Sequence, residues 1–261
     1  MRRMIAPLLA ALFAGSAPAE DLIEIYRDAV ANDAQLAAAR AQYVAAQERL
    51  PQGRAGLLPS IGLTGNTTWN EVDYRTINDK RSYNSNSYSL QLTQPLFRWQ
   101  NWVAFDQAKL QVAQAEAQFA SARQDLVLRA STAYFDVLLA RATLQVLAAQ
   151  KTAVSEQLEA AKKNFEVGTA TITDTHEAQS RYDLVIAQEI AAMSDLEVKR
   201  QALRQIIGKE PGELKTLRTG VELQRPVPED IQKWVEAAEA GAYAVLIQQA
   251  TLEIAQREIE R

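Results

Sequence analysis

The chain has 261 residues, 48% hydrophobic and 23% charged, a composition that excludes a wholly disordered protein. Its 28 basic and 32 acidic residues give a net charge of −4 without a basic block interleaved with aromatic residues, which argues against a nucleic-acid partner. Because the chain has no cysteine, it has neither a disulfide framework nor an N-terminal cysteine that could carry a lipid.

Residues 1–19 have the features of a secretory signal peptide. Two arginines precede an apolar stretch, residues 4–14, and Ala17 and Ala19 occupy the small-residue positions of a cleavage site. We predict cleavage after Ala19. The alternative, a short N-terminal core helix, does not explain why these three features occur together. No stretch of the sequence reaches the ~20 apolar residues that a membrane-spanning helix needs, so any membrane insertion must use strands.

Residues 21–50 are rich in alanine and predict a helix, with one polar break at Asn32-Asp33. Pro51 and the glycines that follow it are expected to end this helix. Two segments of alternating polarity come next, at about 60–72 and 83–97, separated by a polar loop. They predict a β-hairpin with one apolar and one polar face.

Each predicted strand has about ten residues, the length that a tilted strand needs to cross the hydrocarbon layer. Aromatic residues lie toward the strand ends, where membrane barrels carry aromatic girdles: Trp69, Tyr74, Tyr83, Phe97, Trp99 and Trp102. On pattern alone, a half-buried hairpin of a soluble domain is an equally good interpretation.

The interval between Pro95 and Gly168 contains no glycine or proline and predicts one long helix over residues 99–167. Apolar or small residues recur every seven positions and form a coiled-coil seam. Its first row is Phe105, Val112, Phe119, Leu126, Ala133, Ala140, Leu147, Val154 and Ala161. The companion row, interrupted by Lys151, is Ala108, Ala115, Ala122, Ala130, Val137, Leu144, Leu158 and Phe165. A helix of roughly 100 Å needs partners along its length.

A turn over residues 168–173 follows, and Asp174 and Glu177 have the spacing of a capping box. We therefore expect Asp174 to cap a returning helix, residues 174–207, that packs antiparallel to the long helix. Gly208 ends this helix, and a connecting segment over 208–225 comes after it.

Residues 226–261 predict the start of a second copy of this arrangement. A shift of 209 residues aligns residues 229–259 with 20–50 without gaps, after a proline-rich linker. Seven identities in 31 positions are few for alanine-rich segments, so a chance match stays open as an alternative. If the repeat is real, Arg261 corresponds to Gln52, and we expect the chain to be a fragment that stops before a second strand hairpin.

Several stretches resemble sequences of the TolC family of outer membrane efflux and secretion channels, and the resemblance covers essentially all of residues 20–261. The most specific is the turn motif. The stretches are Leu57-Leu58-Pro59-Ser60, Thr93-Gln94-Pro95-Leu96-Phe97, Asn164-Phe165-Glu166-Val167-Gly168-Thr169 with Thr173-Asp174 and Ala178-Gln179, and Leu203-Arg204-Gln205-Ile206-Ile207-Gly208.

The resemblance implies a mainly α-helical fold with a small transmembrane β part. The long antiparallel helical hairpin contributes to a periplasmic α-barrel, and each repeat gives two strands to a trimeric β-barrel. Residues 20–225 are then the first repeat, with 208–225 as its equatorial segment. The implied protein is a homotrimer in the outer membrane, with a periplasmic extension, that serves as an exit duct. The resemblance also implies a periplasmic adaptor and an inner-membrane pump as partners. It does not distinguish between small-molecule efflux and type I protein secretion.

By similarity, Val167, Gly168 and Thr169 form the turn on which the helical hairpin of the adaptor docks. Asp174 is similar to the entrance aspartate that helps to hold the periplasmic mouth closed, in addition to its expected place in the helix cap. The acidic rings that narrow the family's pore lie in the second repeat, so this chain lacks them and its own selectivity cannot be inferred.

Enzymatic chemistry is not expected. His176 is the single histidine, and with no cysteine beside it we predict no metal or cofactor site. We identify no nucleophile motif, no phosphate-binding glycine loop and no catalytic residue. A different class of function, a periplasmic coiled-coil adaptor or structural protein of an export complex, also places a helical hairpin after a signal peptide. Adaptors flank that hairpin with soluble β-domains, whereas membrane-type strands precede it here.

Overall fold

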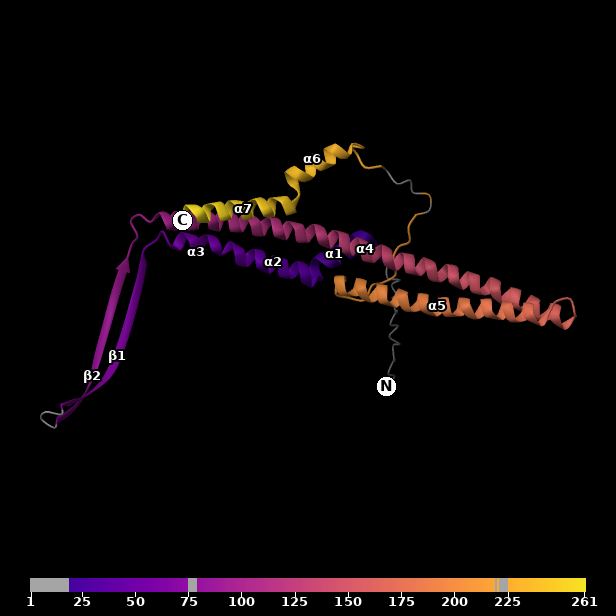
Figure 1. The fold of residues 1–261 in the computed structure, drawn as a ribbon, viewed down its shortest axis with the longest axis horizontal. Helices are drawn as coiled ribbons and strands as arrows, with labels where there is room; N and C mark the ends of the chain where they lie inside the picture. Colours follow the sequence, from indigo (N-terminus) through magenta and orange to yellow (C-terminus); the bar gives the residue numbers. More distant parts are fainter. Residues whose placement is uncertain (1–18, 75–78, 219, 221–224) are drawn as a thin grey trace, which may run out of the picture. The chain divides into compact units, whose positions relative to one another are not determined.

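The computed structural model describes residues 19–74, 79–218, 220 and 225–261 (Figure 1). Within them the chain is mainly helical with one two-stranded antiparallel sheet, as expected. The elements are α1 (Leu22–Asn32), α2 (Ala34–Gln47), α3 (Arg49–Ala55), β1 (Ser60–Tyr74), β2 (Asp79–Thr93), α4 (Trp99–Glu166), α5 (Ile172–Ile207), α6 (Ile231–Gly241) and α7 (Tyr243–Glu260). Ala17 and nearly all of the expected signal peptide lie outside the described residues. None of the helices in these ranges is both long and apolar enough to cross a membrane.

The chain divides into two compact units. The first contains α1, the start of α2, the part of α4 from Arg123 onward, and α5 with the segment that follows it. The second contains the rest of α2, α3, both strands, α4 up to Ala122, α6 and α7. α4 runs through both units as one helix of 68 residues, close to the predicted bounds.

The N-terminal helical region is interrupted at Asp33, so the expected single helix over 21–50 is wrong. Asp33 has an extended backbone conformation, with φ −65° and ψ 120°, which ends α1. Its carboxylate accepts a hydrogen bond from Leu36 N at 2.7 Å, as an N-cap does, and α2 begins. Helical structure also continues past Pro51 to Ala55, because this proline is the third residue of α3, where a missing N–H costs no helical hydrogen bond.

A buried ion pair holds this interruption against α4 within the first unit. Arg129 donates two hydrogen bonds to the Asp33 carboxylate, at 2.9 and 3.0 Å, and the Asp33 side chain is only 4% exposed. Arg129 also pairs with Asp125 at 2.7 Å. The hydrogen bond from Arg129 lowers the pKa of Asp33, and Asp33 in turn raises the pKa of Arg129. The bidentate pair thereby compensates for the desolvation of the carboxylate.

The predicted seam along α4 is confirmed. Its buried members are Ala108, Leu126, Ala130, Val137, Ala140 and Leu158. The other positions of the two rows are half-buried, except that Phe165 in the last turn is exposed.

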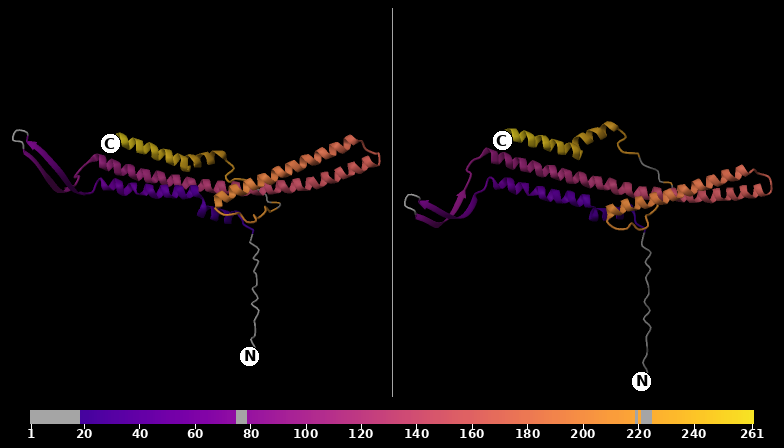
Figure 2. Two further views of the ribbon diagram at one scale, coloured as in Figure 1. Left: turned by 90° about the horizontal axis from the view of Figure 1, so that it is seen from below. Right: turned by 60° about the horizontal axis from the view of Figure 1, so that its bottom comes forward.

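α5 returns antiparallel to α4, and the two helices lie side by side in every view (Figures 1 and 2). Val185, Leu203 and Ile207 are buried on α5. Ile190 and Met193 are 61% and 50% exposed. At the level of Ile190, the buried side chain of α5 is the charged one at position 189.

Two ion pairs join α4 and α5. Lys151, the residue that interrupts the predicted seam, pairs with Glu189 at 2.6 Å, and Glu189 is only 8% exposed. The hydrogen bond from Lys151 to Glu189 raises the pKa of this lysine. Lys199 of α5 pairs with Asp136 of α4 at 3.0 Å. The interruption of the apolar seam is therefore matched by an acidic residue on the partner helix.

In the second unit, α2, α3 and α7 contact the first part of α4. Tyr43 of α2 stacks on Phe119 of α4 with ring centroids 5.7 Å apart. Arg49 of α3 donates to Gln111 at 2.7 Å. Polar side chains of α4 reach α7 at several levels: Trp99 donates to Glu260 O, Gln107 to Ile254 O and Gln114 to Thr251 Oγ1.

The bounds of α1 and α6 differ by the same 209 residues that align the two segments in the sequence. α1 and α6 are both 11 residues long and correspond residue for residue, and their N-caps are Asp21 and Asp230. Asp33 and its equivalent, Ala242, have nearly the same extended backbone. The φ and ψ angles are −65° and 120° at Asp33 and −66° and 129° at Ala242. This agreement supports a structural repeat, although Ala242 has no side chain that could cap α7.

We expect Arg129→Met to lower the free energy of unfolding by about 2–3 kcal/mol near neutral pH, because it leaves the buried Asp33 carboxylate without its cation. The sign of the pH dependence follows from the lowered pKa of Asp33. The stabilisation that the pair gives is present above the unfolded pKa of ~3.9 and is lost as pH falls through the folded pKa. The free energies of unfolding of the wild type and of Arg129→Met, measured by denaturant titration, should therefore differ near neutral pH and become equal in acid.

Asp125→Asn is the matched control, because it removes only the exposed partner of Arg129. It should change stability by less than about 1 kcal/mol. An Arg129→Met protein as stable as the wild type near neutral pH would show that the pair does not hold the interruption in place.

Candidate functional site at the hairpin tip and the strand pair

The turn between α4 and α5, in the first unit, is organised by one backbone carbonyl. Asn164 O accepts hydrogen bonds from Thr169 N at 2.8 Å, from Ala170 N at 3.2 Å and from the Thr169 hydroxyl at 3.0 Å. Gly168 has φ +77°, a left-handed conformation that glycine adopts without strain. A Cβ on Gly168 would have no atom within 4 Å, and Val167 is 72% exposed. The structure thus brings Val167, Gly168 and Thr169 together in one hydrogen-bonded turn that faces solvent.

α5 begins at Ile172, so the residue that caps it is Thr171, and the prediction that Asp174 is the N-cap is wrong. The Thr171 hydroxyl accepts from Asp174 N at 3.3 Å, and the Asp174 carboxylate accepts from Thr171 N at 2.8 Å. Thr171 and Asp174 thus form the capping box, with Asp174 as its third helical residue. Glu177, the expected second member of the box, pairs with Arg181 at 2.6 Å instead.

Asp174 provides a fixed negative charge at the tip. Hydrogen bonds from the backbone N–H of Thr171 and then from its hydroxyl lower the pKa of Asp174. The dipole of α5 also favours an anion in its first turn. Asp174 is therefore ionised at neutral pH, exposed, and adjacent to the turn that carries Gly168.

The strand pair, in the second unit, is longer than the sequence predicts. Ser60 lies opposite Thr93 and Tyr74 opposite Asp79 in one continuous antiparallel register. The predicted second strand, 83–97, is therefore wrong at both ends. The polar residues 79–86 pair with β1, and side chains link the two strands here: the Thr67 hydroxyl lies 2.7 Å from the Asn86 Oδ1 and 3.0 Å from the Asn84 Oδ1. β2 ends before Pro95, which has no N–H and a fixed φ.

The two faces of the strand pair differ in polarity, as predicted. On the apolar face, Ile61 lies opposite Leu92 and Leu63 opposite Leu90, and these four side chains are between 68% and 78% exposed. The other face carries Tyr83, Val72 and Arg81 toward its far end, and over the rest of its length it carries small or uncharged polar side chains: Ser60, Gly62, Thr64, Asn66, Thr68, Asn70, Ser85, Ser87, Ser89, Gln91 and Thr93. An exposed apolar face of this kind indicates a surface that contacts a membrane or another protein.

Exposed aromatic residues lie at both ends of this apolar face. Trp69, 80% exposed, is on the same face nearer the end of β1 at Tyr74, whereas Tyr83 lies opposite Asn70 on the polar face. Phe97, Trp99 and Trp102 follow the other end of β2, the last two in the first turns of α4, and all three are about half exposed or more. The side chain of Tyr74 lies outside the described residues.

Two residues of the tip escape sequence reasoning. Thr171 has a sequence signal, the Thr-x-x-Asp spacing, but Asp-x-x-Glu fits the same pattern three residues later. Asn164 acts through its backbone carbonyl and has no side-chain signal. His176 is exposed near the start of α5, and the described residues contain no cluster of His, Cys, Asp and Glu that could bind a metal ion.

Comparison with known proteins gives consistent matches. The sequence matches the family described as outer membrane efflux protein over residues 25–209. It is 36% identical over 241 residues to the outer membrane protein TolC of Vibrio cholerae, which covers 92% of this chain and 54% of that protein. It is 33% identical over 276 residues to the proteases secretion protein PrtF of Dickeya chrysanthemi, which covers 100% of this chain and 59% of that protein. The chain thus spans little more than half the length of these relatives.

Solved structures share the fold. The CusC structure has a TM-score of 0.74 at 14% sequence identity and covers 90% of this chain and 54% of that chain. The outer membrane protein VceC from Vibrio cholerae has a TM-score of 0.63 at 21% identity and covers 88% of this chain and 58% of that chain.

Proposed function

Because the chain belongs to the outer membrane efflux protein family, we propose that it forms part of an exit duct across the outer membrane. β1 and β2 contribute to a barrel that a second repeat and two further copies complete, in a homotrimer. The α4–α5 hairpin contributes to a helical tunnel on the periplasmic side. A periplasmic adaptor docks on the tip turn and connects the duct to an inner-membrane pump.

One observation carries this proposal: the apolar face of the strand pair is exposed, although a polar face stands directly behind it. Two strands also leave two sheet edges with unpaired N–H and C=O groups, which hydrocarbon does not tolerate. The apolar face can meet lipid only if other strands pair with these edges and close a barrel. The small polar side chains of the opposite face then line the lumen.

The protein conducts its cargo and does not transform it. The relatives include outer membrane proteins named TolC, and PrtF and AprF, which are named as protease secretion proteins. We propose that the duct serves both small-molecule efflux and type I protein secretion. A deletion strain tests this directly, because it should accumulate toxic amphiphilic compounds and retain secreted protease inside the cell. Recovery of the protein in the periplasm and its absence from the outer membrane would favour the adaptor hypothesis instead.

A charge on the lipid-facing side of β1 should prevent membrane insertion, whereas the same charge on the adjacent residue, which faces the other side, should not. Leu63→Arg is expected to cost about 2–4 kcal/mol of membrane stability near the bilayer centre. Thr64→Arg, the adjacent residue on the polar face, faces the lumen and should be tolerated. Heat resistance of the trimer in outer-membrane extracts measures both effects, and equal loss in the two variants would refute the assignment of the faces.

A large side chain at Gly168 should abolish export without affecting assembly. Apart from its two chain neighbours, nothing in the chain lies within 4 Å of its Cβ position, so the Gly168→Trp side chain clashes with no part of the hairpin, although any side chain is strained at this φ of +77°. Gly168→Asn is the control, because asparagine tolerates the left-handed conformation and projects much less. We expect wild-type trimers in both variants and loss of efflux only with tryptophan. Full export by Gly168→Trp would rule out the turn as a contact.

Asp174 is proposed to hold the entrance closed in addition to its place in the capping box. Asp174→Ala in the intact protein should then raise single-channel conductance in planar bilayers. Thr171→Val removes the hydroxyl of the same box and keeps the carboxylate, so it should leave conductance unchanged. If both variants raise conductance equally, the effect comes from the frayed helix end and Asp174 is only part of the cap.

A further inference from the structure

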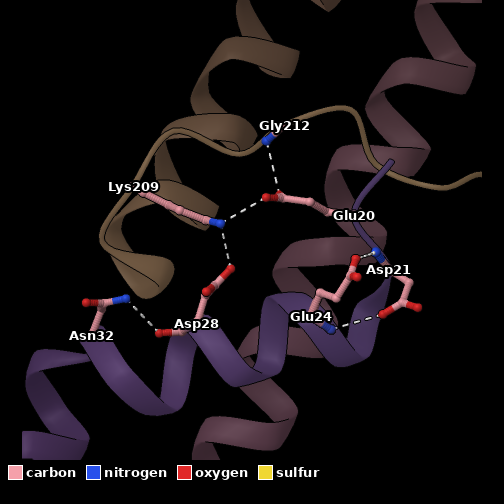
Figure 3. Close-up of polar contacts among 7 residues, drawn as sticks. All are labelled: Glu20, Asp21, Glu24, Asp28, Asn32, Lys209 and Gly212. Carbon is pink, nitrogen blue, oxygen red and sulfur yellow. Dashed lines mark hydrogen bonds and ion pairs between the residues drawn. The ribbon is translucent and has the colours of Figure 1, made fainter. Parts of the chain in front are cut away.

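Glu20, the residue after the expected cleavage site, joins the N-terminal segment to the chain that follows α5 (Figure 3). Its backbone N donates to Glu213 O at 2.7 Å, and its carbonyl accepts from Lys215 N at 3.0 Å, so that it forms a parallel bridge with Leu214. Its carboxylate accepts from Lys209 Nζ at 2.9 Å and from Gly212 N at 3.1 Å. Both the backbone and the side chain of Glu20 therefore bind the segment 209–215.

The groups around Glu20 carry an excess of negative charge. Lys209 also pairs with Asp28 at 2.8 Å, and Lys215 with Asp21 at 3.5 Å. The Glu24 carboxylate accepts from Asp21 N at 2.9 Å. Figure 3 shows Lys209 between the carboxylates of Glu20 and Asp28. Three carboxylates, those of Glu20, Asp21 and Asp28, thus share two lysines, and the Glu24 carboxylate adds a further negative charge, so one more cation would be stabilised here.

We propose that the Ala19–Glu20 bond is the processing site and that the ammonium group released on Glu20 is the missing cation, locking residues 209–215 onto the mature N-terminus. A protease of the signal peptidase class hydrolyses the bond with one water molecule. The water's OH group goes to the Ala19 carbonyl carbon and its hydrogen goes to the Glu20 nitrogen. The resulting carboxylic acid gives its proton to the amine, so the leader leaves as a carboxylate and Glu20 keeps an ammonium.

Processing strengthens a contact that the uncut chain already makes. In the uncut chain, a neutral peptide N–H donates to Glu213 O. After hydrolysis the same nitrogen donates from a charged group, and a charge-assisted hydrogen bond is roughly twice as strong as a neutral one. The ammonium also offsets one of the excess negative charges. This inference stands on the contacts of Glu20 and does not require the proposed duct to be correct.

The test compares mature proteins that differ only in the position of the ammonium. The wild-type gene gives a free Glu20, and a gene with Gly-Ser inserted between Ala19 and Glu20 moves the charge two residues away but keeps a peptide N–H on Glu20. Mass spectrometry of the purified outer-membrane form identifies the N-terminus. Hydrogen-exchange protection of the Lys215 amide, which donates to Glu20 O, reports on the lock.

We expect the wild-type N-terminus at Glu20 and about 3–10-fold lower protection of the Lys215 amide in the inserted variant near pH 6.5. Acidic neighbours raise the pKa of an ammonium above its unfolded value of ~8, so the difference should persist below that value and disappear as pH rises through the folded pKa. The charged or titratable residues on the segments that meet here are Glu20, Asp21, Glu24 and Asp28, Lys209, Glu213 and Lys215, and Tyr134 of α4, whose hydroxyl donates to Lys215 O at 2.8 Å.

Glu20→Gln serves as the contrast, because it weakens the contact with Lys209 and keeps the ammonium, so its loss of protection should persist at high pH. A mature N-terminus at another residue overturns the proposal. Equal protection in the wild-type and inserted proteins, or a difference that does not change with pH, also overturns it.

Discussion

The structure depends on a requirement of the backbone: every N–H and C=O group that leaves water must find a partner. A helix meets this requirement within itself, whereas a pair of strands meets it on one side of each strand only. β1 and β2 pair along their whole length, yet each keeps an open edge beside an exposed apolar face. The chain therefore presents a lipid-compatible surface that it cannot use alone, and association with further strands is a physical necessity for insertion.

A comparison of residues 209 positions apart separates what α1–α2 and α6–α7 have in common from what differs between them. The extended residue between α1 and α2 recurs between α6 and α7 with the same backbone angles, although Asp33 is replaced by Ala242. The break itself is therefore a property of the backbone path. The anchor is a property of the side chain, because Arg129 reaches Asp33 and an alanine offers no carboxylate. An ion pair fixes the break at Asp33 to α4. The break at Ala242 has no carboxylate and cannot form such a pair.

Local patterns predicted the regular elements well, and interactions between distant residues account for the errors. The seam of α4 was predictable because a heptad pattern repeats over many turns and averages out local exceptions. The sequence marked a polar break at Asn32-Asp33 but did not predict that the helix ends there, because alanines surround the break and Arg129, the partner of Asp33, lies 96 residues away. The stretch 79–86 has serine and asparagine, which disfavour strands, and it is a strand because its partner strand and Thr67 engage it.

The charges on the hairpin also set its register. Alanines along the seam of α4 fit many alignments of α5, so they specify little by themselves. Lys151 meets Glu189, and at the second level the order is reversed, with Asp136 on α4 and Lys199 on α5. A slide that brought Asp136 toward Glu189, or Lys151 toward Lys199, would oppose like charges and leave a buried carboxylate without its cation. Two pairs of opposite polarity thus stabilise one alignment and penalise its neighbours, which places the tip turn and Asp174 at the end of the hairpin.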